Sequence, residues 1–107
     1  MNQEAENGAR GIHVVTLRCK DETHAEHCLG ALRDHGRPDA MAYGCRSYDF
    51  GPQASDSRTI MLVERWDDFS ALDRLLAEKV VPALPTYNAL LERDFDPAND
   101  TMRISVA

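Results

Sequence analysis

Glu64 and Trp66 form the pair of residues in this sequence that most clearly suggests a chemical site. They follow residues 59–63, a run of branched and apolar residues that predicts a strand. Side chains two positions apart on a strand point to the same face, so this carboxylate and the only tryptophan should share one space. The pair predicts a pocket floor where the sheet passes into a helix. A tryptophan that only fills the core is the alternative.

Three further side chains are candidates for the same site. His13 lies on the first predicted strand and is the best-placed general base, with Glu64 as the alternative base. Its structural alternative is a histidine that is hydrogen-bonded at the surface or at a dimer seam. Tyr48 and Arg46 lie on the strand before Glu64, on one predicted face with each other. Together with Trp66 they form the predicted substrate-binding set.

These residue types suit the oxygenation of an electron-rich aromatic without a cofactor. A deprotonated hydroxyaromatic can itself transfer an electron to O₂, so the protein must favour the anion and exclude water. That requires a base, a cation or hydrogen-bond donor, and an aromatic wall. His13 or Glu64 would be the base, Arg46 or Arg65 the cation, and Trp66 with Tyr48 the wall. The chain has no phosphate-binding loop, nucleotide fingerprint or Ser-His-Asp constellation.

The elements that must position these residues follow the order β-α-β-β-α-(α)-β, which predicts a ferredoxin-like α+β subunit with an antiparallel sheet. The predicted strands are residues 12–19, 41–50, 59–66 and 102–106, with a turn-rich loop at 51–57. Thr23 and Glu26 predict a capping box for the first helix, and Gly36 with Pro38 should end it. The second helix should start at Asp67 or Asp68 and break at Pro82 and Pro85, and Thr86 should cap a short third helix.

Length and composition limit the alternatives. The 107 residues predict one domain at 12–107, preceded by a disordered polar tail at 1–11. A net charge of −6 argues against nucleic acid and against an anionic membrane surface as partners. No run approaches the length of a membrane span, and the first residues do not resemble a signal peptide, so the expected location is the cytoplasm.

The cysteines and histidines predict no metal site. Cys19, Cys28 and Cys45 form no CxxC pair, so each is expected to be a small buried apolar residue. His24 and His27 are one helical turn apart, which is adequate for two metal ligands. They also lie on the polar face of the first predicted helix, and a solvated face explains them without a metal.

Two short motifs carry a resemblance to a known family. The sequence Gly44-Cys45-Arg46-Ser47-Tyr48, followed by Glu64-Arg65-Trp66 and then Leu72, resembles the antibiotic biosynthesis monooxygenase (ABM) family over about residues 12–91. The resemblance implies that the domain at 12–107 is a ferredoxin-like subunit that pairs into a dimeric α/β barrel. It implies cofactor-independent oxygenation, with O₂, of a quinol-like or polyketide-type aromatic. Relatives degrade haem or act on small signalling molecules.

The chain also departs from that family. No histidine follows Trp66, and Leu75, Leu76 and Lys79 occupy the neighbourhood where many members carry one. Haem-degrading relatives use that histidine with an asparagine on the first strand, where this chain has Val14 or Val15. These departures argue against haem degradation by the family's usual mechanism. They leave a non-catalytic dimer that binds a small molecule, or a haem-binding relative, as the alternative functions.

The sheet itself predicts a homodimer. Helices on one side of a four-stranded sheet leave the other side bare, with Met61 and Val63 on it. Two such faces packed together in an isologous dimer would bury both.

Overall fold

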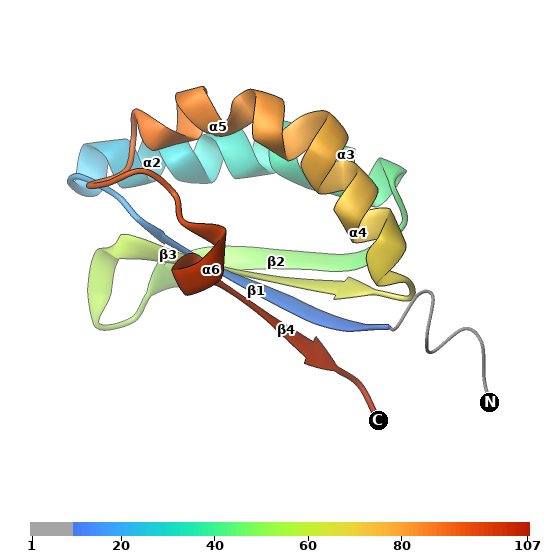
Figure 1. The fold of residues 1–107 in the computed structure, drawn as a ribbon. Coiled ribbons are helices and arrows are strands. Elements are labelled where there is room, and N and C mark those ends of the chain that lie inside the picture. Colours follow the sequence, from blue (N-terminus) through green and yellow to red (C-terminus); the bar gives the residue numbers. More distant parts are fainter. Residues whose placement is uncertain (1–9) are drawn as a thin grey trace.

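The computed structural model describes residues 10–107, which form a four-stranded antiparallel sheet with helices across one face (Figure 1). The strands lie in the order β2-β3-β1-β4. Their bounds are β1 Gly11–Arg18, β2 Cys45–Gln53, β3 Asp56–Trp66 and β4 Thr101–Ser105. The predicted ferredoxin-like α+β fold is confirmed. Residues 1–9 of the predicted tail lie outside the described residues, and Gly11 already belongs to β1.

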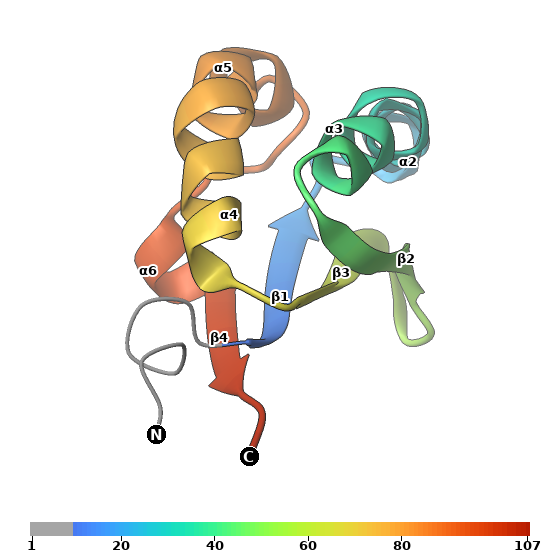
Figure 2. The ribbon, with the colours of Figure 1, turned by 90° about the vertical axis from the view of Figure 1, so that its right-hand side faces the viewer.

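Two long helical segments cover the sheet side by side (Figure 2). Each consists of an α-helix, a π-helical turn and a second α-helix without interruption. The first is α2 Glu22–Ala31, the π turn Leu32–Gly36 and α3 Arg37–Ala42. The second is α4 Phe69–Leu75, the π turn Leu76–Val80 and α5 Val81–Asn88. A short helix, α6 Pro97–Asp100, precedes β4. No helix within residues 10–107 is both long enough and apolar enough to cross a membrane.

The prediction that prolines end both helices is wrong, and the π turns explain why. Inside an α-helix a proline lacks one N–H and its ring clashes with the carbonyl four residues earlier. Here the residue before each proline bonds five residues back, Arg37 to Leu32 and Val81 to Leu76. This wider turn changes the bonding register directly before Pro38 and Pro82, so both helices continue.

The later proline and the glycine do not interrupt the helices either. Pro85 lies inside α5, so Thr86 is an internal residue of that helix and caps nothing. Gly36 has helical backbone angles, and the left-handed residue that follows the first helical segment is Gly44, with φ of 108°. β2 therefore starts at Cys45, later than expected.

Two other boundaries differ because a local hydrogen bond decides them. Asp21, and not Thr23, caps α2: its carboxylate accepts from the His24 backbone N–H at 2.8 Å. Asp68 caps α4 in the same way, accepting from the Ser70 N–H at 2.8 Å, which settles the choice between Asp67 and Asp68. The hairpin between β2 and β3 is shorter than the predicted loop, since β2 extends to Gln53 and β3 starts at Asp56.

The alternation along β1 and β3 separates two faces of the sheet. The face under the helices carries the buried residues His13, Val15, Leu17, Ile60, Leu62, Glu64 and Trp66. The opposite face, which we call the open face, carries Ile12, Val14, Met61, Val63, Met102 and Ile104. Val63, Met102 and Ile104 are 37%, 58% and 43% exposed in this chain alone. All three cysteines are buried with free thiols, as predicted.

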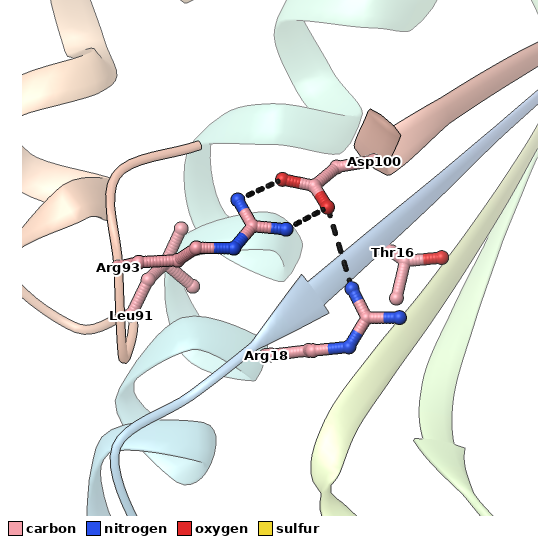
Figure 3. Close-up of a pocket in the computed structure, with 5 residues that line it drawn as sticks. All are labelled: Thr16, Arg18, Leu91, Arg93 and Asp100. Atoms are coloured by element: carbon pink, nitrogen blue, oxygen red, sulfur yellow. Dashed lines mark hydrogen bonds and ion pairs between the residues drawn. The ribbon is translucent and has the colours of Figure 1, made fainter. Parts of the chain in front are cut away.

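A buried aspartate ties the last part of the chain to the sheet (Figure 3). Asp100 is 6% exposed and accepts hydrogen bonds from Arg93 at 2.7 and 2.9 Å and from Arg18 at 3.3 Å. Burial alone raises the pKa of this carboxyl, yet the hydrogen bonds from Arg93 and from the Asp96 N–H hold it below its ordinary value. The space they enclose, also lined by Leu91, is only about 10 Å³, enough for one water at most. We interpret the cluster as structural.

Candidate functional site

The three predicted catalytic residues lie together in a buried hydrogen-bonded network. His13 on β1 is directly opposite Glu64 on β3, and its Nδ1 lies 3.1 Å from Glu64 Oε1. Trp66 Nε1 donates to the same oxygen at 2.8 Å. His13 and Glu64 are each 4% exposed and Trp66 is 2% exposed. We call these three residues the His13–Glu64–Trp66 network.

The network fixes how the histidine can act. An ionised carboxylate only accepts hydrogen bonds, so Glu64 requires the proton of His13 to be on Nδ1. The Nε2 of His13 then has a free lone pair and can accept a proton from a bound molecule. Glu64 would stabilise the imidazolium that this transfer creates. A buried carboxylate beside a histidine is the arrangement that orients a general base.

Tyr48 lies beside the network on β2. It lies opposite Glu64 in the β2–β3 ladder and is 7% exposed. Burial, and then the charge of Glu64, raise the pKa of Tyr48 well above its ordinary value, so its hydroxyl stays protonated and can serve as a donor. The Phe50 ring meets the Tyr48 ring edge-on at 5.8 Å. A Cβ on Gly36 would lie 2.5 Å from the Tyr48 hydroxyl, so the π turn places a residue without a side chain against this hydroxyl.

Arg46 does not lie with Tyr48, contrary to the sequence prediction. The β2–β3 register shifts between Cys45 and Ser47, and this bulge inserts Arg46 as an extra residue. Its side chain is 67% exposed and pairs with Asp67 at 2.6 Å. The bulge therefore separates Arg46 from Glu64.

Arg46 and Trp66 both line an open depression. This depression has a volume of about 270 Å³ and lies at the end of the sheet where β1 starts and β3 ends. Its lining residues are Arg10, Gly11, Arg46, Arg65, Trp66, Asp67 and Val106. We call it the sheet-end depression. Trp66 is the residue that both this depression and the His13–Glu64–Trp66 network contain.

Sequence reasoning missed the groups from the helices and from β2 that bear on Tyr48. Tyr87 on α5 and the thiols of Cys28 and Cys45 contribute to the raised pKa of Tyr48. Burial raises the pKa of Tyr87 and of Cys28 to about 12, and that of Cys45 to about 11, so all three are protonated at neutral pH. The only signal in the sequence was that Tyr87 shares a helical stripe with Leu90 and Leu91, which indicates a core position equally well.

The described residues include no group of three or more His, Cys, Asp or Glu side chains that could hold a metal ion. His24 is hydrogen-bonded to Asp21, with 2.7 Å between Nδ1 and Oδ1. It therefore contributes to the N-terminal cap of α2.

No protein-family model and no curated protein sequence matches this chain significantly. Solved structures do match it. The Mycobacterium tuberculosis protein Rv0793 is 22% identical with a TM-score of 0.71, covering 92% of this chain and 96% of that protein. A protein described as an antibiotic biosynthesis monooxygenase is 18% identical with a TM-score of 0.68, over 90% and 98% of the two chains.

A third neighbour is described as a dimeric ferredoxin-like protein and comes from an uncultured marine organism. It is 11% identical with a TM-score of 0.67, covering 94% of this chain and 90% of that protein. This chain therefore has the fold of antibiotic biosynthesis monooxygenases and of ferredoxin-like proteins related to them in structure, as the sequence motifs implied. One fold supports many activities, so the function must be argued from the site.

Proposed function

We propose that this protein is a cofactor-independent monooxygenase that uses O₂ to oxidise a quinol-like or polyketide-type aromatic. The observation that carries the proposal is the pairing of His13 with Glu64 beneath the helices, with Trp66 on the same carboxylate. Buried ionisable groups are uncommon unless they are paired, and a carboxylate that holds a histidine in place can orient it as a general base. The neighbouring structure described as an antibiotic biosynthesis monooxygenase supports this class of reaction.

The proposed reaction needs only the substrate, O₂ and the side chains of this site. His13 Nε2 takes the proton of an aromatic hydroxyl, and Glu64 stabilises the resulting imidazolium. The aromatic anion reduces O₂; one oxygen atom is incorporated at a ring C–H as a carbonyl, and the other leaves as water. A naphthol and O₂ thus give a naphthoquinone and water, so atoms and electrons balance. The protonated Tyr48 hydroxyl would donate to developing negative charge.

Oxygen consumption tests this proposal. We expect uptake above the buffer rate when the protein is mixed with at least one member of a panel containing 1-naphthol, 1,4-dihydroxynaphthalene and anthrone. With ¹⁸O₂ and 1-naphthol, one labelled oxygen should appear in the quinone. Added catalase should not return oxygen, because water and not peroxide is the second product. No uptake with any member of the panel would contradict the proposal.

The near-complete burial of the network favours a second candidate, a dimer that binds a small aromatic molecule without turnover. Glu64 is already satisfied by two donors within the protein, as it would be in a purely structural role. A rise in melting temperature with a panel member, without oxygen uptake, would support this candidate. The haem-binding alternative is tested separately, by the presence of a Soret band after haem titration.

We further propose that the protein is a homodimer through its open face. Val63, Met102 and Ile104 are partly exposed there, and covering them would remove apolar area from water. The neighbour described as a dimeric ferredoxin-like protein supports pairing.

A stable interface should bury more than about 1,000 Å² in total. Sedimentation at micromolar concentration should give a dimer, and Val63→Glu should give a folded monomer. A monomeric parent protein under these conditions would contradict the proposal.

A further inference from the structure

We infer that the sheet-end depression binds a small aromatic carboxylate, with Arg65 and Arg46 holding the carboxylate and Trp66 contacting the ring. This inference concerns binding and does not depend on oxygenase activity. The depression has the size for such a ligand, because about 270 Å³ is slightly below the range of about 300–1,000 Å³ that is typical for drug-sized molecules. One or two fused rings with a carboxylate would fit.

The charge of the lining favours an anion. Arg10, Arg46 and Arg65 line the depression, and Asp67 is the only carboxylate side chain among the lining residues. The local excess is positive although the whole chain has a net charge of −6. Guanidinium groups are planar and donate two parallel hydrogen bonds to a carboxylate, which gives both affinity and orientation.

Arg65 is the best-placed of the three for the ligand. Among residues 10–107, no carboxylate lies within ion-pair distance of Arg65, whereas Arg46 is held by Asp67 at 2.6 Å. Asp67 thereby fixes the Arg46 guanidinium at the rim, and its remaining N–H groups stay able to donate. Arg65 lies opposite Ile12, so its side chain is on the open face at the end of the sheet, and a carboxylate between Arg65 and Arg46 would meet donors from two strands there.

The backbone at this end of the sheet is shaped in a way that leaves the depression open. The bulge at Cys45 and Ser47 turns Arg46 out of the regular ladder and toward the end of β3. Gly11 contributes no side chain to the lining. A Cβ there would collide with the Ile104 carbonyl oxygen and approach the Phe69 ring at 3.0 Å, so packing against β4 and α4 requires the glycine.

The apolar part of the lining supplies the surface for a ring. Trp66 lines the depression with the 2% of its surface that is exposed, and Val106 is 45% exposed at its side. Because Trp66 Nε1 also donates to Glu64, a ligand in the depression touches a residue of the His13–Glu64–Trp66 network. Trp66 is the only tryptophan, so its fluorescence reports on this position alone.

Calorimetric titration with 2-naphthoate and its neutral analogue 2-naphthamide tests the inference, with Trp66 fluorescence as a second readout. We expect 2-naphthoate to bind and to change the fluorescence, and 2-naphthamide to bind at least about tenfold more weakly because it lacks the charge. Arg65→Gln and Arg46→Gln should each weaken 2-naphthoate about tenfold and leave the binding of 2-naphthamide little changed.

Arg33→Gln is the matched control, because Arg33 is 64% exposed and paired with Asp34 at 3.0 Å, much as Arg46 is paired with Asp67. Arg33→Gln should change the affinity for 2-naphthoate by less than about twofold. If arginines attracted the anion non-specifically, Arg33→Gln would weaken 2-naphthoate binding as much as Arg46→Gln does. Equal affinity for the two naphthyl compounds, an equal effect of Arg33→Gln, or displacement of 2-naphthoate by equimolar inorganic phosphate would overturn the inference. Because no step requires turnover, a protein without oxygenase activity can still give the expected result.

Discussion

Replacing His13 with glutamine is expected to lower kcat for the oxidised aromatic by about 100-fold or more, with KM little changed. The amide side chain in His13→Gln keeps a donor for Glu64, but it has no basic nitrogen. Loss of a positioned general base typically costs about 10²- to 10⁴-fold, and the loss falls on kcat because proton transfer belongs to the reaction step. Initial rates of oxygen uptake over a range of substrate concentrations give both constants.

A second histidine provides the control. His27 lies exposed on α2 and belongs to neither the His13–Glu64–Trp66 network nor the sheet-end depression, so His27→Gln should leave both constants unchanged. Full activity in His13→Gln would remove His13 as the base and leave only a structural role.

Most of this network was predictable from sequence because side chains alternate between the two faces of a strand. Glu64 and Trp66 share a face through their two-residue spacing, and the short connection to the preceding strand places Tyr48 beside them. His13 was a candidate only as a strand histidine. Its position opposite Glu64 depends on the pairing of β1 with β3, which no local pattern specifies.

Arg46 shows where that reasoning fails. Strict alternation places it on the Tyr48 face, but one inserted residue in the ladder reverses the direction of every side chain before it. A bulge is a property of two paired strands, so the sequence of β2 alone does not reveal it. The sheet-end depression, which depends on this bulge, was therefore not predicted.

The helix ends failed for a related reason. The rule that proline stops a helix assumes α-helical bonding, and at Pro38 and Pro82 a π turn has already changed the bonding register. Because of these π turns, each helical segment continues past the proline at which the sequence predicted its end. The first π turn places Gly36 against the Tyr48 hydroxyl. The wrong prediction of a helix end at Gly36 therefore also missed the residue that covers Tyr48.

Replacing Glu64 with alanine is expected to destabilise the fold by about 3 kcal/mol, because the carboxylate is buried and accepts from two donors. Glu64 is 4% exposed and accepts from both His13 and Trp66, so its removal leaves two buried donors without their acceptor, together with a cavity. For a domain of this size that corresponds to a fall in melting temperature of roughly 15 °C. Glu64→Gln retains a carbonyl acceptor and should cost about half as much or less.

A double-mutant cycle with Trp66→Phe then separates a structural role of the network from a role in ligand binding. Trp66→Phe removes one donor to Glu64, so its cost in stability should be about 1 kcal/mol smaller in the Glu64→Ala background than in the wild type. If Trp66 also contacts a ligand, Trp66→Phe should fold but lose most of the affinity for 2-naphthoate. If Trp66→Phe leaves the affinity for 2-naphthoate unchanged and still shows the expected coupling to Glu64 in stability, Trp66 is only a core residue. Its hydrogen bond to Glu64 would then stabilise the fold without contributing to ligand binding.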